Sequence, residues 1–366
     1  MLSNTKKKMD NLKTRNRNLT ADFLKAVMIF CVLYGHSVSM INGLRDVTWQ
    51  DSVVNVFVTT FEMPLFILIS GYYLFFSLKK KPHFKVLCQR IVSIAIPLII
   101  WEGIPAVYKF IIKPMGDGFS FINIIKVVYN LIFPELWFLA CYLICCILVI
   151  LVDWLISKIS KRALAITAGA LIYFGIIVGL HLINHSLNHV PYMFPFFLTG
   201  FVLSKYSLLK KSRMKKILWI FAILFVVLYP FYKPENSFYI LGTYVAKENV
   251  FTLLPVFVHR FVLGLSGCSL FYLIANFFCE KQNNKIVLTI VKFGSKTMEM
   301  YILSMFVQKI LQSIFRELIS DVSVITNITA PLVFGPVFLI IMTAVCLLVN
   351  WLIEKIPVLH KLMFGR

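Results

Sequence analysis

The chain has 366 residues, of which 59% are hydrophobic and 14% charged, and its formal net charge is +21. Soluble domains carry about 25% charged residues, and a soluble fold would leave large apolar surfaces exposed with this composition. The composition therefore excludes a soluble globular enzyme, a disordered chain and a small disulfide-rich secreted domain. It predicts an all-α polytopic membrane protein, because one spanning helix needs roughly 20 apolar residues.

The excess of Lys and Arg has two interpretations. In a soluble protein it would indicate nucleic-acid binding. Here the basic residues stand in short connections between apolar runs, which favours membrane topology and contact with anionic lipids. We therefore expect membrane lipids as partners and no nucleic acid. The eight cysteines lie in or beside apolar segments and form no pair of CxxC motifs, so they predict buried thiols.

A basic tail at residues 1–19 precedes the apolar part of the chain. Ten apolar segments follow, at 20–42, 52–78, 84–112, 131–153, 163–181, 190–206, 216–232, 250–279, 290–315 and 330–354. Prolines within 84–112 and 190–206 predict kinked or partly spanning helices. We expect one transmembrane domain at 20–354 and a C-terminal tail at 355–366.

The distribution of charge between these segments predicts the orientation. With the N-terminus in the cytoplasm, the predicted inner connections hold most of the 37 Lys and Arg residues. This is the positive-inside bias of membrane proteins. It predicts an even number of spans with both termini in the cytoplasm.

The first apolar segment contains three ionisable residues, Asp22, Lys25 and His36. Ionisable groups inside a span are costly, so each is a candidate functional residue. Lys25 and His36 are eleven positions apart, which puts them on one helix face at axial positions roughly 16 Å apart. The alternatives are a helix-entry ion pair between Asp22 and Lys25, and a structural hydrogen bond for His36.

Glu62 lies in the second apolar segment at a depth comparable to that of His36. A buried carboxylate beside an imidazole raises its basicity and fixes its tautomer. Such a pair is sufficient for the imidazole to act as a general base on a hydroxyl. The alternative is a structural ion pair between Glu62 and a basic residue elsewhere.

Further charged residues fall in later apolar segments. Arg90 and Lys296 lie near the predicted cytoplasmic ends and, with Lys25, could line a vestibule that accepts phosphate groups. The alternative for both is that they extend to the lipid headgroups. Arg260 is near the middle of 250–279, where a structural role is hardest to explain.

Three histidines, His181, His185 and His189, are spaced four residues apart at the outer end of the fifth segment. On a helix they would share a face and could bind a metal ion. The alternative prediction for the same stretch is a loop that lines an outer cleft. We expect no metal site and assign these histidines no role.

Several motifs, in this order, resemble the membrane-bound acyltransferase family 3. They are Asp22…Lys25…His36-Ser37, Met63-Pro64-Leu65-Phe66…Ser70-Gly71-Tyr72, Leu136-Trp137-Phe138-Leu139, Phe194-Pro195-Phe196-Phe197-Leu198-Thr199-Gly200, Gly294-Ser295-Lys296-Thr297…Tyr301-Ile302-Leu303 and Pro357…Phe364-Gly365. The resemblance extends over about 20–365. It departs from the family pattern at Glu62 and Ser304, where many members have His.

The resemblance implies an O-acyltransferase, with His36 as the base or acyl-handling residue and Lys25 near an acyl-CoA donor. We expect an O-acetyltransferase in the bacterial cytoplasmic membrane, with acetyl-CoA as co-substrate and no tightly bound cofactor. The acceptor would be a hydroxyl of a cell-surface polysaccharide, a lipid-linked glycan or a small molecule. The rival interpretation is a transporter or flippase for a glycan precursor or an anion, and the oligomeric state is left open.

The expected site follows from this interpretation. Its catalytic residues are His36, Glu62 and Asp22, with Glu62 orienting His36. Arg260 would stabilise an oxyanion or complete the donor site. The residues expected to bind donor or substrate are Lys25, Arg90, Arg260, Lys296, Tyr301 and Trp137.

Overall fold

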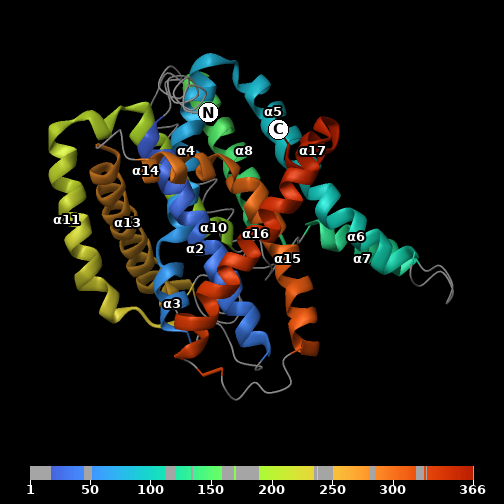
Figure 1. The fold of residues 1–366 in the computed structure, drawn as a ribbon. Helices are drawn as coiled ribbons and strands as arrows, with labels where there is room; N and C mark the ends of the chain where they lie inside the picture. The colour runs from blue at the N-terminus through green and yellow to red at the C-terminus, as the bar shows by residue number, and fades with distance from the viewer. Residues whose placement is uncertain are drawn as a thin grey trace, which may run out of the picture.

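The computed structural model describes residues 18–44, 52–112, 121–132, 135–158, 169, 189–234, 237, 250–280, 285–318, 325–326 and 328–365. All regular secondary structure in these ranges is helical (Figure 1). The prediction of an all-α polytopic membrane protein is confirmed.

Seven helical stretches within the described ranges are long and apolar enough to cross a membrane. They are Leu19–Leu44, Val53–Lys80, His83–Ile112, Trp137–Lys158, Ser212–Phe231, Leu254–Glu280 and Ala330–Glu354. Each corresponds to one of the ten expected segments. Of the other three, 163–181 lies outside the described residues except for residue 169. The segment 190–206 is the 17-residue helix α10 (His189–Lys205), and 290–315 is divided between α14 (Lys285–Phe293) and α15 (Thr297–Leu318).

Helix α2 (Leu19–Leu44) is central in the bundle. It packs against α13 (Val250–Glu280), α14, α15 and α16 (Gly335–Glu354). Helix α11 (Ser212–Leu228) covers the outside of α13, and α5 (His83–Leu98) packs on α8 (Trp137–Lys158) on the other side (Figure 1). The helices thus surround a core that α2 and α4 (Glu62–Lys80) pass through.

Helices α4 and α10 pack with their backbones in close contact. A Cβ atom at Gly71 would lie 2.0 Å from the carbonyl oxygen of Phe197, and one at Gly200 would lie 1.9 Å from that of Leu68. Without a hydrophobic effect between helices in lipid, small residues permit the close packing that holds them together. The two glycines therefore fix the position of α4, which carries Glu62 at its first turn.

The prolines in the third and tenth segments coincide with widened helical turns. Helix α5 continues through η2 (Ile99–Gly103), α6 (Ile104–Val107) and η3 (Tyr108–Ile112), of which η2 and η3 are π-helical. A proline lacks an N–H and clashes with the preceding turn, and a wider turn accommodates both effects. A third π-helical turn, η10 (Ala330–Phe334), precedes α16.

Short elements complete the described chain. They are α3 (Val53–Thr59), α7 (Phe121–Ile132), α17 (Pro357–Phe364) and the 3-10 turns η6 (Leu208–Lys210), η7 (Tyr229–Phe231) and η9 (Gly294–Lys296).

The C-terminal segment, expected as a tail, is packed into the bundle. The Nε1 atom of Trp101 donates to the carbonyl oxygen of Met363 at 2.9 Å, and Phe364 is fully buried. Gly365 has φ 69°, and a Cβ atom there would lie 1.9 Å from the carbonyl oxygen of Ser93. Helix α17 is thus part of the transmembrane fold, because its apolar side chains and its end fit against α5 and η2.

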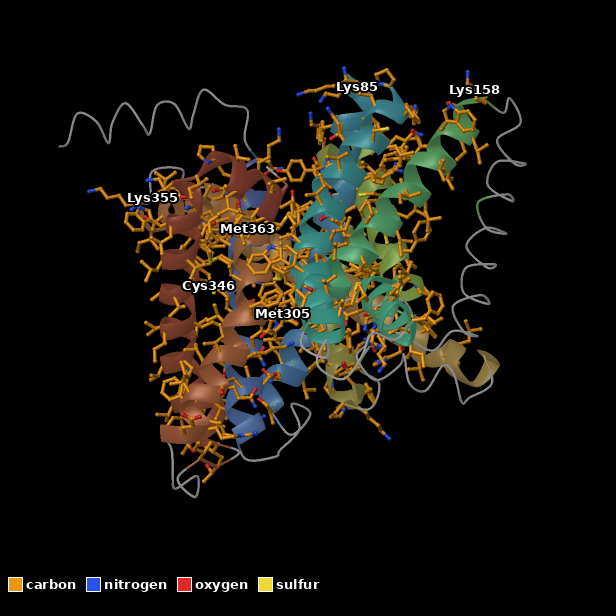
Figure 2. All side chains as sticks on the ribbon, turned by 90° about the vertical axis from the view of Figure 1, so that its right-hand side faces the viewer. Lys85, Lys158, Met305, Cys346, Lys355 and Met363 are labelled. Atoms are coloured by element: carbon orange, nitrogen blue, oxygen red, sulfur yellow. The ribbon has the colours of Figure 1, made fainter. Side chains whose placement is uncertain are left out.

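One end of the molecule is strongly basic. Lys85, Lys158 and Lys355 lie at this end in Figure 2, and the start of α2 and helix α17 lie there in Figure 1. The arrangement agrees with the charge pattern from which a cytoplasmic location of both termini was predicted. We call this the basic end.

Candidate active site

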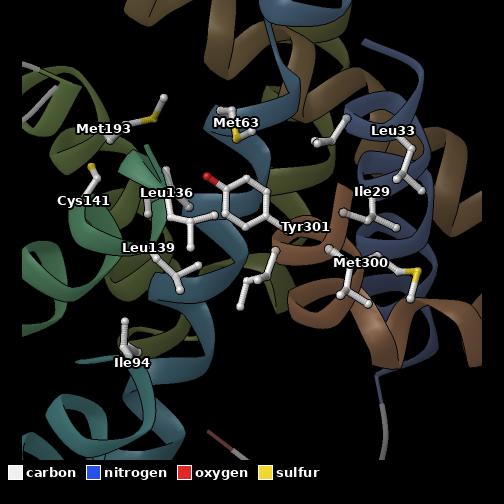
Figure 3. Packing of buried hydrophobic residues seen from close by; sticks show 14 of the residues in the cluster. Ile29, Leu33, Met63, Ile94, Leu136, Leu139, Cys141, Met193, Met300 and Tyr301 are labelled. Atoms are coloured by element: carbon white, nitrogen blue, oxygen red, sulfur yellow. The ribbon is translucent and has the colours of Figure 1, made fainter. Parts of the chain in front are cut away.

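Two cavities lie within the bundle and meet at two side chains. The inner cavity, of about 500 Å³, is nearer the basic end and is lined by residues that include Lys25, Tyr73 and Arg90. The outer cavity, of about 220 Å³, is lined by residues that include His36, Glu62 and Trp137. Met63 and Tyr301 line both cavities. Figure 3 shows these two side chains next to each other in the packed core.

The imidazole of His36 faces the outer cavity from α2 and is held by α15. Its Nδ1 atom lies 2.9 Å from the Oγ atom of Ser304, and that hydroxyl donates to the carbonyl oxygen of Tyr301 at 2.8 Å. A serine hydroxyl has one hydrogen to donate. The hydrogen-bond network therefore assigns the imidazole hydrogen to Nδ1. The Nε2 atom keeps its lone pair and can act as a base.

Glu62 lines the same cavity from the opposite wall. Its carboxylate is buried and stands in the first turn of α4, where the positive end of the helix dipole stabilises a negative charge. The structure thus brings His36 and Glu62 into one cavity. The Nδ1 atom of His36 bonds to Ser304, and the orientation of the imidazole by Glu62 stays a prediction.

Trp137 forms an aromatic wall of the outer cavity. Its ring lies 4.4 Å from that of His189, in an edge-to-face arrangement. Of the three spaced histidines, His181 and His185 lie outside the described residues. In the part of the chain that the structure describes, no cluster of three His, Cys, Asp or Glu residues could hold a metal ion.

Lys25 lies in the inner cavity, where its Nζ atom pairs with Asp22 at 3.2 Å and lies 4.4 Å from the centre of the Tyr73 ring. The alternative of an ion pair at the helix entry is therefore what the geometry supports for these two residues. Asp22 faces the inner cavity and His36 the outer one. The structure thus separates Asp22 from the base, contrary to the expectation that both belong to one catalytic group.

Arg90 lines the inner cavity from α5. Its guanidinium donates to the hydroxyl groups of Tyr142 at 3.3 Å and Ser77 at 3.1 Å. Both partners are neutral, so its positive charge is left to attract an anion. Arg90 also lines a further cavity of about 500 Å³ at the protein surface, the entrance cavity, to which Lys80 and Lys81 contribute.

Two of the expected binding residues lie elsewhere. Lys296 pairs with Glu354 at 2.8 Å, while its neighbours Ser295 and Thr297 line the inner cavity. Arg260 is buried between α13 and α10, with its guanidinium 4.3 Å from the centre of the Tyr192 ring, and it lines neither cavity. Whether such a side chain faces a cavity depends on its exact position on the helix and on which helix packs against it. The sequence specifies neither the position nor the neighbouring helix.

Glu102 fixes the start of α8, beside which the two cavities meet. Its carboxylate oxygens accept hydrogen bonds from the backbone N–H of Leu136 at 2.7 Å and from the side-chain amide of Asn130 at 3.3 Å. Glu102 stands in the π-helical turn η2. It thereby satisfies a backbone donor that a helix start otherwise leaves unpaired.

A family model described as an acyltransferase domain matches residues 18–351. The chain belongs to this acyltransferase family. The match includes every residue that lines the outer cavity and most of those that line the inner cavity. The resemblance drawn from the sequence motifs is therefore confirmed.

Two curated relatives of this chain are both called nodulation protein NolL. The protein from Sinorhizobium fredii is 25% identical over 197 residues, which cover 52% of this chain and 50% of that protein. The protein from Mesorhizobium japonicum is 30% identical over 89 residues, or 24% of each chain. The chain thus spans at most about half the length of these relatives. No solved structure matches it.

The candidate site contains residues that the sequence motifs did not single out for a role. Ser304 was noted only as a departure from the family pattern, and Lys80 and Lys81 only as topology signals. Tyr142 and Glu102 act through contacts with helices that are distant in sequence. No periodicity along the chain could have revealed those contacts.

Proposed function

We propose that this protein is an integral-membrane O-acyltransferase that takes an acyl group from acyl-CoA and transfers it to an acceptor hydroxyl. The observation that carries the proposal is the pair of cavities that meet at Met63 and Tyr301. The inner cavity is lined by the cations Lys25 and Arg90, and the outer cavity is lined by the base His36. Such an arrangement suits two substrates that approach from opposite sides.

The donor would enter from the basic end. Lys80, Lys81 and Arg90 surround the entrance cavity and suit the phosphates of CoA, because charge-assisted hydrogen bonds to phosphate are strong. The pantetheine arm would extend through the inner cavity past Lys25 to Tyr301. The space between the buried side chains of Met63 and Tyr301 favours a short acyl group such as acetyl.

The acceptor would occupy the outer cavity. His36 Nε2 would remove the proton of its hydroxyl, a contribution that is typically about 10²- to 10⁴-fold in rate. The cavity is lined by the Trp137 ring and by polar side chains, among them Asn55, Glu62 and Gln308. An aromatic wall with carboxylate and amide groups suits a sugar, so we propose a hydroxyl of a cell-surface or lipid-linked glycan as the acceptor.

We further propose that the protein resides in a bacterial cytoplasmic membrane with its basic end in the cytoplasm, where acyl-CoA is available. The chemistry then needs no tightly bound cofactor, because the thioester supplies the activated acyl group. Membrane lipids would surround the apolar outer faces of the helices.

Labelled acetyl-CoA tests the proposal with protein purified in nanodiscs. CoA release and label transfer are measured with and without a membrane glycan extract, for wild type and His36→Ala. We expect acceptor-dependent CoA release in wild type and at least a 100-fold loss in His36→Ala, with CoA binding retained. A wild-type protein that neither binds acetyl-CoA nor releases CoA would contradict the proposal and favour the transporter.

A further inference from the structure

The hydroxyl of Tyr301 occupies an unusual position in the molecule. The side chain is 6% exposed, its hydroxyl makes no hydrogen bond to any described residue, and it borders both cavities. Figure 3 shows the hydroxyl directed toward the side on which Met63 and Leu136 lie. Burying a hydroxyl without a partner costs free energy, so its presence at the junction of two cavities points to a ligand atom there.

The start of α8 faces the same point. Helix α8 has 22 residues and begins at Trp137, so the backbone N–H of Phe138 stands in its first turn. The centres of the Phe138 and Tyr301 rings lie 5.7 Å apart, and both residues line the inner cavity. The first N–H groups of a helix have no intrahelical partners and lie at the positive end of the helix dipole. Leu136 N is bonded to Glu102, which anchors this turn. Phe138 and Trp137 line the inner and the outer cavity respectively.

We propose that the Tyr301 hydroxyl and the Phe138 backbone N–H form the oxyanion hole of the acyl transfer. The inference rests on the proposed function and specifies how its charged intermediate is stabilised. Two preorganised donors at a buried point stabilise developing negative charge much better than water does. The role was expected for Arg260, which lines neither cavity.

The step can be written with all atoms in balance. The acceptor oxygen forms a bond to the thioester carbonyl carbon, its proton passes to His36 Nε2, and the carbonyl π electrons move to the oxygen. Tyr301 and Phe138 N–H donate to this oxyanion. On collapse the C–S bond breaks, and the CoA sulfur leaves with the bonding pair and takes the proton from His36. The products are the acyl ester and CoA.

One turn of α15 holds the base and the proposed oxyanion hole in register. Ser304 bonds to His36 and to the backbone of Tyr301. The imidazole of His36 and the hydroxyl of Tyr301 are therefore positioned by the same short segment. This geometry lets His36 act on the acceptor hydroxyl while the Tyr301 hydroxyl and the Phe138 N–H donate hydrogen bonds to the thioester oxygen.

The first test replaces Tyr301 with Phe, which removes the hydroxyl and keeps the ring between the cavities. We expect the kcat for acetyl transfer from acetyl-CoA to the membrane glycan extract to fall by about 10²- to 10³-fold. We expect the KM for acetyl-CoA and the Kd for CoA to stay within about twofold of wild type. An unchanged kcat would overturn the inference.

A second test uses two variants of Phe138. Proline lacks an N–H and is tolerated in the first turn of a helix, so Phe138→Pro removes the proposed backbone donor. Phe138→Ala removes the ring to the same extent and keeps the N–H. We expect kcat to be at least tenfold lower in Phe138→Pro than in Phe138→Ala, with both proteins binding CoA. Equal kcat values in two CoA-binding proteins would overturn the backbone contribution.

Wild-type turnover separates this inference from the proposed function. If wild type transfers acetyl groups but Tyr301→Phe does so equally well, only the oxyanion hole is wrong. If wild type shows no transfer with any extract, both are wrong.

Discussion

His36 can act as a base only if its free nitrogen faces the acceptor, and Ser304 decides which nitrogen is free. The Ser304 hydroxyl donates to the Tyr301 carbonyl and accepts from His36 Nδ1. Serine oxygens often bond to the carbonyl one turn earlier in a helix. Here the bond to the Tyr301 carbonyl fixes the orientation of the Ser304 hydroxyl, and the hydroxyl in turn fixes the orientation of the His36 ring.

We expect Ser304→Ala to lower kcat by about fivefold, because one hydrogen bond of about 1 kcal/mol holds the ring and its tautomer. Ser304→Thr keeps the hydroxyl and should restore most of the activity. The measurement is acetyl transfer from acetyl-CoA at saturating donor, with CoA affinity as the control for folding. Equal activity of Ser304→Ala and wild type would show that the hydrogen bond has no positioning role.

Arg90 and Lys296 are two cations that differ in their partners and can be compared directly. Arg90 faces the donor route with neutral partners, whereas Lys296 is engaged by Glu354. We expect Arg90→Gln to raise the Kd for CoA at least tenfold, since a hydrogen bond to a charged group contributes about 1.5–3 kcal/mol. Lys296→Gln should leave it within about twofold. Calorimetric titration of CoA into nanodiscs measures both, and equal effects would refute the proposed donor route.

At the scale of elements, the site depends on how closely α4 and α10 approach each other. Gly71 and Gly200 allow backbone contact between the two helices. Helix α4 carries Glu62 and Met63 toward the outer cavity, while α10 begins at His189 beside Trp137. Separation of these helices would therefore change the outer cavity as well as the stability.

We expect Gly200→Ala to destabilise the protein by about 1–3 kcal/mol or more, because its Cβ atom would lie 1.9 Å from a backbone oxygen. Gly35→Ala is the control: its Cβ atom would lie 4.0 Å from the nearest side-chain atom, in Asn55. Thermal unfolding in the same detergent measures the difference. A Gly200→Ala protein as stable as Gly35→Ala would contradict the close packing.

At the scale of the whole molecule, the inner cavity, the outer cavity and the basic charge are arranged along one axis. The basic end, the entrance cavity and the inner cavity lie on one side of Tyr301, and the outer cavity lies on the other. A donor that carries phosphates and an acceptor on the far side would then meet at the middle of the bundle. Which side of the membrane the donor enters from therefore depends on the orientation of the protein in the membrane.

We expect a membrane-impermeant maleimide to label Val53→Cys but not Lys158→Cys in intact cells, in a background with Cys88→Ser. Val53 is exposed on α3, at the end opposite the basic end (Figure 1). Both variants should be labelled after the cells are opened. Labelling of Lys158→Cys in intact cells would reverse the orientation and place the donor route on the wrong side.

The sequence by itself determined the fold class, the spans now described, the family and the residues His36 and Lys25 on one helix face. These follow from hydropathy, charge balance and helix geometry, which act locally along the chain. It also indicated irregular helix geometry near Pro97 and Pro105, where the structure has π-helical turns, since a missing N–H perturbs a helix.

Only the tertiary structure decided which charges meet. Arg260 stacks on Tyr192, and Lys296 pairs with Glu354. Ser304 holds His36, and the start of α8 meets Tyr301. The physical reason is that side-chain partners on separate helices depend on helix rotation, crossing angle and close contacts such as that at Gly71 and Gly200. None of these is encoded in the periodicity of a single segment.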